Sequence, residues 1–219
     1  MLKSIYNKLR YLVSKDGEKG EASSGFLPPR VRERALSAID IDTGDLLELG
    51  CGEGLFIIEA ARRFPGMRIT GVEISEDVLR EAKRKVEAAG LKDINVARGS
   101  ADKTGFEDGA FSRVICLNML YNLASKGALE AVIREMKRIC NKGGSIIFDI
   151  RNRSNPIVRL AYRNAAAYDP ECPWPLNAYT LKEMEEMLKG CNMSIKRVFP
   201  VVNIFGLFPL AYIMEAVKS

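Results

Sequence analysis

A glycine-rich turn between a strand and a helix constrains this chain more than any other feature. Residues 46–54 read Leu-Leu-Glu-Leu-Gly-Cys-Gly-Glu-Gly, and their apolar first half predicts a buried strand over residues 45–49. A helical pattern follows over residues 54–64. Glycines between a strand and a helix permit a tight turn and let a ligand approach the backbone closely. The segment therefore predicts a strand–loop–helix unit with a ligand site at the loop.

Strands and helices alternate along the rest of the chain. Ser75 is an expected helix N-cap, Thr180 and Glu183 predict a capping box, and Gly143-Gly144 is expected to turn the chain into a strand. The alternation predicts an α/β fold with a mostly parallel sheet, which binds ligands at the carboxyl ends of its strands. Strands are expected at residues 45–49, 68–74, 94–98, 113–117, 145–150, 193–202 and 208–217, and helices at 31–39, 54–64, 76–89, 127–140 and 181–190.

Composition excludes several function classes. The chain has 219 residues, which suits a single domain over residues 1–219, and its net charge of +5 is below that typical of nucleic-acid binders. It has no histidine, which excludes Ser-His-Asp hydrolases and HExxH metalloproteases. Five scattered cysteines without a CxxC pair predict no disulfide framework and no metal site, and favour a reducing, cytoplasmic location.

The first residues combine apolar and basic positions. Residues 1–13 predict a basic amphipathic helix, and the polar, glycine-rich stretch up to residue 24 predicts a linker. The helix is interpreted as docked on the domain, with a membrane-surface contact or a lid over a site as alternatives. Charges interrupt any signal-peptide pattern there, and prolines interrupt the apolar run at residues 198–214, so no transmembrane segment is expected.

An acid ends the second expected strand. Glu73 lies 19 residues after Gly54, at the end of this strand. A carboxylate at that place can accept hydrogen bonds from both hydroxyls of a ribose. The glycine spacing is G-x-G-x-G, and Leu55 stands where the dinucleotide fingerprint G-x-G-x-x-G has its last glycine. A nicotinamide cofactor is therefore not expected.

With these features the chain resembles the class I methyltransferases that use S-adenosylmethionine, and in particular their type-11-like branch. The resemblance rests on residues 46–54, 69–75, 99–111 and 113–117, and it covers about residues 40–150. It implies a Rossmann-like, doubly wound sheet of seven mostly parallel strands with an antiparallel last strand and helices on both faces. It also implies that residues 40–150 form the cofactor-binding core.

The resemblance implies a role for each matching position. The loop would lie beneath the methionine and ribose parts of the cofactor, Glu48 would support it and reach the methionine amino group, and Glu73 would hold the ribose. Asp102 is a candidate for the adenine contact, because Ser100 stands where the family usually has an acid. The implied cofactor-binding residues are Glu48, Gly50, Cys51, Gly52, Gly54, Glu73, Ile74, Ser100, Ala101, Asp102 and Asn118, with no metal.

The acceptor side is less defined by the sequence. Tyr121 follows the fourth strand and is a candidate substrate contact, but no catalytic residue is assigned. Residues 151–179 lie where the family builds part of a substrate lid, and they contain four arginines and four aromatic residues, with Trp174 between two prolines. The segment predicts a pocket for an anionic, aromatic or amphipathic molecule, or alternatively a solvated basic helix with a packed loop.

Three functions follow from these features. The first is methyl transfer from S-adenosylmethionine to a small-molecule acceptor. The alternatives are an RNA or protein methyltransferase and a non-catalytic S-adenosylmethionine-binding regulatory protein. Nucleic acid is the less favoured partner because no separate nucleic-acid-binding domain is visible. The acceptor atom and the oligomeric state are not predicted.

Overall fold

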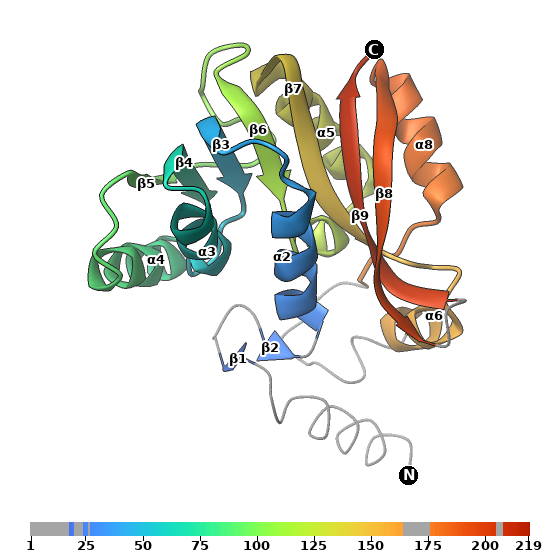
Figure 1. The fold of residues 1–219 in the computed structure, drawn as a ribbon. Coiled ribbons are helices and arrows are strands. Elements are labelled where there is room, and N and C mark those ends of the chain that lie inside the picture. Colours follow the sequence, from blue (N-terminus) through green and yellow to red (C-terminus); the bar gives the residue numbers. More distant parts are fainter. Residues whose placement is uncertain (1–17, 20–23, 26, 164–175, 205–207) are drawn as a thin grey trace.

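Seven strands form one sheet in the computed structural model, which describes residues 18–19, 24–25, 27–163, 176–204 and 208–219. The sheet order is β5-β4-β3-β6-β7-β9-β8 (Figure 1). The last strand along the chain, β9, runs antiparallel to both of its neighbours, and the other pairs are parallel. The predicted α/β fold is confirmed. The strands are β3 (Thr43–Leu49), β4 (Gly66–Glu73), β5 (Ile94–Arg98), β6 (Phe111–Cys116), β7 (Cys140–Arg151), β8 (Met193–Ile204) and β9 (Phe208–Lys218).

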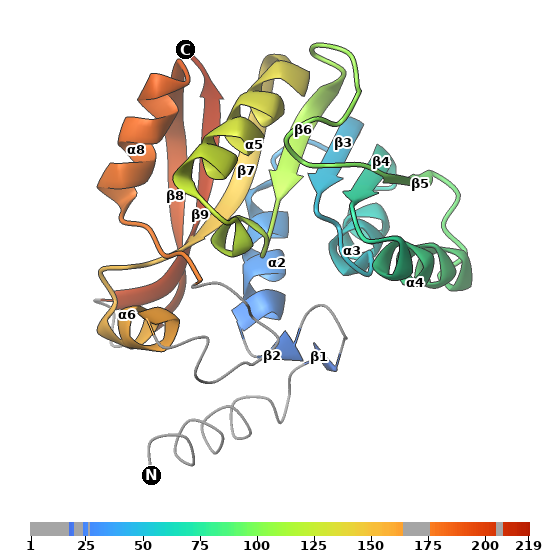
Figure 2. The ribbon, with the colours of Figure 1, turned by 180° about the vertical axis from the view of Figure 1, so that it is seen from behind.

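Helices cover both faces of the sheet. Because successive strand residues point to opposite faces, Leu46 packs into one core and Leu47 into the other. The core around Leu46 contains α2 (Leu27–Ala38), α3 (Leu55–Arg63) and α4 (Glu76–Ala88). The core around Leu47 contains α5 (Lys126–Ile139) and α8 (Leu181–Gly190), which Figure 2 shows in front of the sheet. Helices therefore cover both faces of the sheet, which is the doubly wound arrangement that the resemblance implies.

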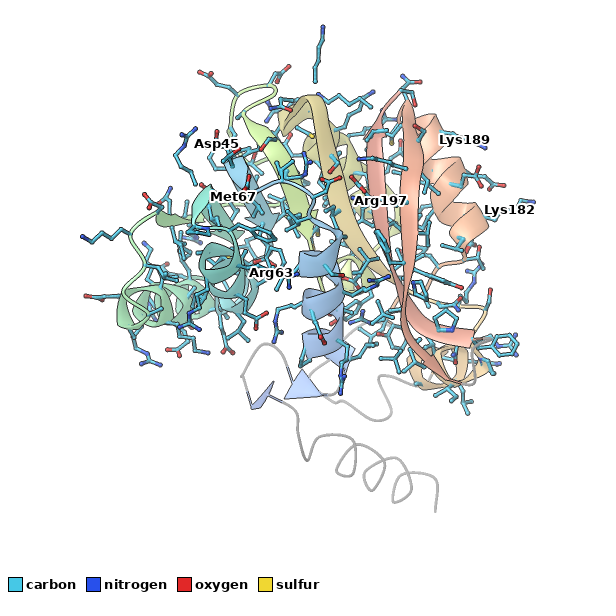
Figure 3. The ribbon with its side chains drawn as sticks, viewed as in Figure 1. Asp45, Arg63, Met67, Lys182, Lys189 and Arg197 are labelled. Carbon is cyan, nitrogen blue, oxygen red and sulfur yellow. The ribbon has the colours of Figure 1, made fainter. Side chains whose placement is uncertain are left out.

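An arginine connects the first helix to the end of the chain. Arg197 of β8 donates a hydrogen bond from Nη2 to the Ala38 carbonyl, 2.8 Å away, at the end of α2 (Figure 3). The same guanidinium pairs with Glu215 of β9, which is fully buried and also accepts from Lys196. These partners hold the pKa of Glu215 below its usual range despite the burial. The pair therefore fixes α2 against β8 and β9.

Smaller elements lie at the edge of the sheet where the parallel strands end. They are the 3-10 turn η1 (Leu120–Asn122) and the helix α6 (Pro156–Arg163). The short strands β1 (Glu18–Lys19) and β2 (Ser24–Gly25) pair antiparallel within the segment that the sequence predicts as a linker. Figure 1 shows β1, β2 and α6 below the ends of β3 and β6. The predicted helix at residues 1–13 lies outside the described residues, and within the described ranges no helix is long and apolar enough to cross a membrane.

Three local predictions differ from the structure. The helix expected at residues 31–39 begins four residues earlier, as α2 (Leu27–Ala38). Gly143-Gly144 does not precede the strand but lies within β7, where Cys140 pairs with Phe111 and the regular register resumes only at residue 145. A Cβ at Gly144 would lie 2.7 Å from the Ser112 carbonyl oxygen, so glycine permits this bulge. Ser75 does precede α4, but its side chain makes no capping bond. The predicted capping box at Thr180 and Glu183 is confirmed.

Candidate functional site

The glycine loop joins β3 to α3 at the carboxyl edge of the sheet. Gly50 and Cys51 both donate their N–H groups to the Val72 carbonyl oxygen of β4, at 2.8 and 3.0 Å. Gly52 has a φ of 53°, in the left-handed region that favours glycine, and a Cβ there would meet no atom within 4 Å. The loop is therefore anchored to β4 on one side and leaves space at Gly52 on the other.

Glu73 ends β4 and binds this loop through its carboxylate. Oε2 accepts the Gly52 N–H at 3.1 Å, while Oε1 accepts the N–H groups of Ile74 and Ser75, both at 2.9 Å. Glu73 thus fixes the backbone of Ile74 and Ser75, which leads into α4. An ionised carboxylate has about four lone-pair sites, so the fixed group can accept at least one further donor. The structure places a rigid acceptor beside the glycine loop.

Cys51 has a packing role within the loop. Its thiol is buried, and a Cβ on Gly71 of β4 would lie only 2.8 Å from its Sγ. Burial, together with the charges of Glu48 and Glu73, raises the pKa of the thiol well above its usual range. The protonated thiol is unreactive, so the contacts of Cys51 indicate a packing role for its side chain within the loop.

Glu48 lies on β3 directly before the loop. Its side chain is buried, and its Oε2 has no hydrogen-bond partner in the structure. Burial raises the pKa of Glu48 well above its usual range, and the nearby Arg32 opposes that shift. A buried acceptor without a partner is costly, so a ligand that donates a hydrogen bond here would be stabilised.

The turn after β5 reaches the same edge. Gly99 donates its N–H to the Glu73 carbonyl oxygen at 3.1 Å, which places Ser100, Ala101 and Asp102 beside the end of β4. The Ser100 hydroxyl donates to the Asp102 carboxylate. Ile74, at the same place, is 63% exposed, which is unusual for a large apolar side chain. The predicted adenine-contact residues therefore lie together.

A buried cluster lies at the carboxyl ends of β6 and β7, and we call it the Asp149–Arg151 cluster. Asp149 accepts the Asn118 N–H on Oδ1 and pairs with Arg151 through Oδ2. Arg151 also donates from Nη2 to Asn118 Oδ1 at 2.8 Å. Both charged side chains are almost fully buried. These contacts hold Asn118 at a φ of 56°, which non-glycine residues rarely adopt.

Two tyrosines complete the Asp149–Arg151 cluster. The Arg151 Cζ lies 4.4 Å from the centre of the Tyr121 ring, and its Nε donates to the Tyr162 hydroxyl at 3.1 Å. Burial raises the pKa of Asp149 and that of Tyr162, although Arg151 opposes both shifts. Since both Asp149 oxygens are occupied, it is a structural anion here rather than an available base.

Arg151 corrects the interpretation of the 151–179 segment. The sequence groups it with the lid arginines, but the structure makes it the last residue of β7 and buries it beside Asp149. The spacing Asp149-x-Arg151 could have revealed this, because alternate residues of a strand share a face. Trp174, the other predicted substrate contact, lies outside the described residues. No group of three or more potential metal ligands occurs within the described ranges.

The fold and the site together define a class of protein. A doubly wound sheet with a glycine loop after its first long strand and an acid at the end of the next belongs to the Rossmann-like folds that bind nucleoside-containing cofactors. Residues 46–144 match a family of methyltransferase domains.

Relatives and solved structures agree with that class. The chain is 29% identical over 126 residues to a phosphatidylethanolamine N-methyltransferase of Cereibacter sphaeroides, covering 57% of this chain and 59% of the relative. It is 29% identical over 118 residues to a demethylmenaquinone methyltransferase of Bacillus cytotoxicus, covering 53% and 48%. The chain thus spans about half the length of the curated relatives it matches.

The fold also matches a SAM-dependent methyltransferase from Methanosarcina mazei with a TM-score of 0.68, at 20% identity over 84% of this chain and 96% of that one. The matched domain and the relatives support membership of the class I S-adenosylmethionine-dependent methyltransferase family, and the solved structure agrees with its fold.

The residues present fit the cofactor that the family implies. The unpartnered Oε2 of buried Glu48 suits an ammonium group, and the fixed Glu73 carboxylate suits ribose hydroxyls. The exposed Ile74 offers an apolar surface for adenine. Three independent positions along one edge thus match three chemically different parts of S-adenosylmethionine.

Proposed function

We propose that this chain transfers a methyl group from S-adenosylmethionine to a small-molecule acceptor. The observation that carries the proposal is the Glu73 carboxylate, which bonds the Gly52 N–H at 3.1 Å and so combines the glycine loop and the second-strand acid in one site. The family membership of the chain supports it.

Each site residue then has a role in holding the cofactor. Gly50, Cys51, Gly52 and Gly54 would lie beneath its methionine and ribose parts. Glu48 would accept from its amino group and Glu73 from its ribose. Ile74, Ser100, Ala101 and Asp102 would contact the adenine, and Asn118 would lie beside the transferable methyl group.

The reaction depends mainly on alignment of the acceptor with the methyl group of the cofactor. When bound, the cofactor supplies an activated methyl group on a sulfonium, and transfer is an in-line displacement. The protein would contribute position: the Asp149–Arg151 cluster holds the backbone at Asn118, and Tyr121 lies next to it. Substrate contacts by Tyr121 and Trp174 belong to the same proposal.

We further propose that the acceptor is amphipathic. Two relatives are named as methyltransferases of phosphatidylethanolamine and of demethylmenaquinone, and both of these molecules are amphipathic. The exposed apolar side chains of α6 lie at the edge of the sheet that holds the site.

Calorimetric titration tests the cofactor assignment. Wild type should bind S-adenosylmethionine and S-adenosylhomocysteine but not NAD. Glu73→Ala should weaken adenosyl binding at least about tenfold, because a hydrogen bond to a charged acceptor contributes about 1.5–3 kcal/mol. Glu76→Ala is the matched control, since Glu76 is an exposed acid in the first turn of α4.

Two results would contradict the proposal: no adenosyl binding by wild type, or equal loss in both variants. Transfer of labelled methyl to lipid extracts, RNA and protein then separates the three functions, and binding without transfer to any of them would favour a regulatory protein.

A further inference from the structure

Exposed apolar side chains gather on one surface, which we call the α6 face. It consists of Ile157, Arg159, Leu160 and Arg163 of α6 and Phe208 at the start of β9. Ile157 is 60% exposed, Leu160 62% and Phe208 51%. Of the four strongly exposed large apolar side chains in the described ranges, three lie here, and the fourth is Ile74 in the cofactor site. Such a concentration marks an interaction surface.

The α6 face is one rigid platform. Asn155, itself buried, precedes α6 and accepts the N–H groups of Ile157 and Val158 on its Oδ1, at 2.9 and 3.2 Å. Its Nδ2 donates to the Phe208 carbonyl oxygen at 2.7 Å. One side chain thus caps the helix and ties it to β9. Val158 is buried on the inner side of α6, so the helix cannot turn its exposed residues inward.

Two cations lie on one side of the apolar residues along α6. Arg159 and Arg163 are four residues apart, both exposed, and neither forms an ion pair within the described ranges. Their neighbour Arg153 differs, because it pairs with Glu183 of α8. Apolar side chains beside a basic stripe are typical of helices that lie in the interface of an anionic membrane.

We propose that the α6 face docks on the surface of an anionic lipid bilayer. Its arginines complement acidic headgroups, while Ile157, Leu160 and Phe208 enter the layer beneath them. A second copy of the chain fits less well, because a symmetric contact would bring the arginines of both copies together.

Docking here would place the bilayer next to the methyl-transfer site. The inner side of α6 carries Tyr162, whose hydroxyl accepts from Arg151 and whose ring lies 6.0 Å from that of Tyr121. One short helix thus connects the outer surface to the loop after β6. Delivery of a membrane-held acceptor along this path rests on the proposed function, whereas docking itself does not.

Vesicle sedimentation of the full chain tests the docking, with phosphatidylcholine vesicles compared to phosphatidylcholine–phosphatidylglycerol mixtures. The wild type should bind the anionic vesicles preferentially. Reversing both charges (Arg159→Glu with Arg163→Glu) should weaken binding at least about 25-fold, since each basic residue contributes about fivefold at such a surface. Ile157→Asp should weaken it roughly tenfold or more.

A charge-matched control separates the α6 face from bulk charge. Lys182→Glu with Lys189→Glu makes the same change on α8, where both lysines are exposed and point away from the sheet (Figure 3). This variant should bind almost as the wild type does. Circular dichroism checks that every variant is folded.

Several outcomes would overturn the docking proposal. They are no preference of the wild type for anionic vesicles, equal weakening in both double variants, full binding by Ile157→Asp, and dimers in solution that Ile157→Asp dissociates without any vesicle binding. Calorimetry with S-adenosylhomocysteine, run in parallel without lipid, reports on the proposed function separately.

Discussion

Replacing Arg151 by methionine tests how the Asp149–Arg151 cluster is stabilised. The substitution keeps much of the side-chain volume but removes the cation beside Asp149, a residue that is only 1% exposed. Removing one partner of a buried ion pair costs about 3–5 kcal/mol, because the other charge stays buried without compensation. We expect Arg151→Met to lose about that much unfolding free energy near neutral pH, measured by urea unfolding with far-ultraviolet circular dichroism.

A second variant also removes the uncompensated carboxylate charge of Asp149. Asp149→Asn combined with Arg151→Met keeps an oxygen for the Asn118 N–H but carries no ion. What remains is the loss of the donors to Asn118 Oδ1 and the Tyr162 hydroxyl, about 1 kcal/mol each. The double variant should therefore be more stable than Arg151→Met by about 1–3 kcal/mol.

The pH dependence gives an independent check. Without Arg151, the pKa of Asp149 rises further above its ordinary value, because burial is no longer opposed. The folded variant then binds a proton more tightly than the unfolded chain does. The variant's loss of unfolding free energy is complete above the pKa of Asp149 in the folded state. It shrinks as the pH falls toward about 3.9, the pKa of an aspartate in the unfolded chain. Equal instability of the single and double variants, or a deficit independent of pH, would refute the electrostatic argument.

Other predictions concern packing, pH and capping. Gly71→Ala should lose about 1–3 kcal/mol of unfolding free energy, because its Cβ would lie 2.8 Å from the Cys51 Sγ, whereas Gly190→Ala, with no atom within 4 Å, should be neutral in the same urea assay. Glu135 accepts bonds that lower its pKa to about 2, so it stabilises the fold above about pH 4.5 and loses that effect as the pH falls toward about 2. Thermal unfolding of Glu135→Gln should show a deficit of about 2 kcal/mol near neutral pH that disappears over this window; a constant deficit would contradict the assignment. Thr180→Ala should lose about 0.5–2 kcal/mol and Thr180→Ser much less, and equal losses in urea unfolding would argue against the capping box.

The sequence determined the order and type of the elements in residues 43–151. Strand and helix periodicity are local properties, so the pattern predicts β5 with its observed bounds and the ends of β3, β4 and β6 to within two residues, whereas β7 begins five residues before its predicted start. Parallel strands place the loops that follow them at one edge, and the resemblance to the methyltransferase family assigned Gly52, Glu73, Ser100 and Asn118 to a common site there. Their roles toward the cofactor stay predictions.

Partners far apart along the chain were decided by the tertiary structure. Nothing local to Glu73 indicates that Gly52, 21 residues away, would donate to it. The spacing Asp149-x-Arg151 indicates a shared strand face, but only the packing buries Arg151 against Asp149, whereas Arg153 pairs with Glu183 at the surface. Burial, and with it the pKa of a carboxylate, depends on which elements pack around a residue rather than on its neighbours in sequence. The chain's own pattern therefore located the edge where the site lies, while the packing of β3, β4, β6 and β7 determined which side chains there are free to meet a ligand.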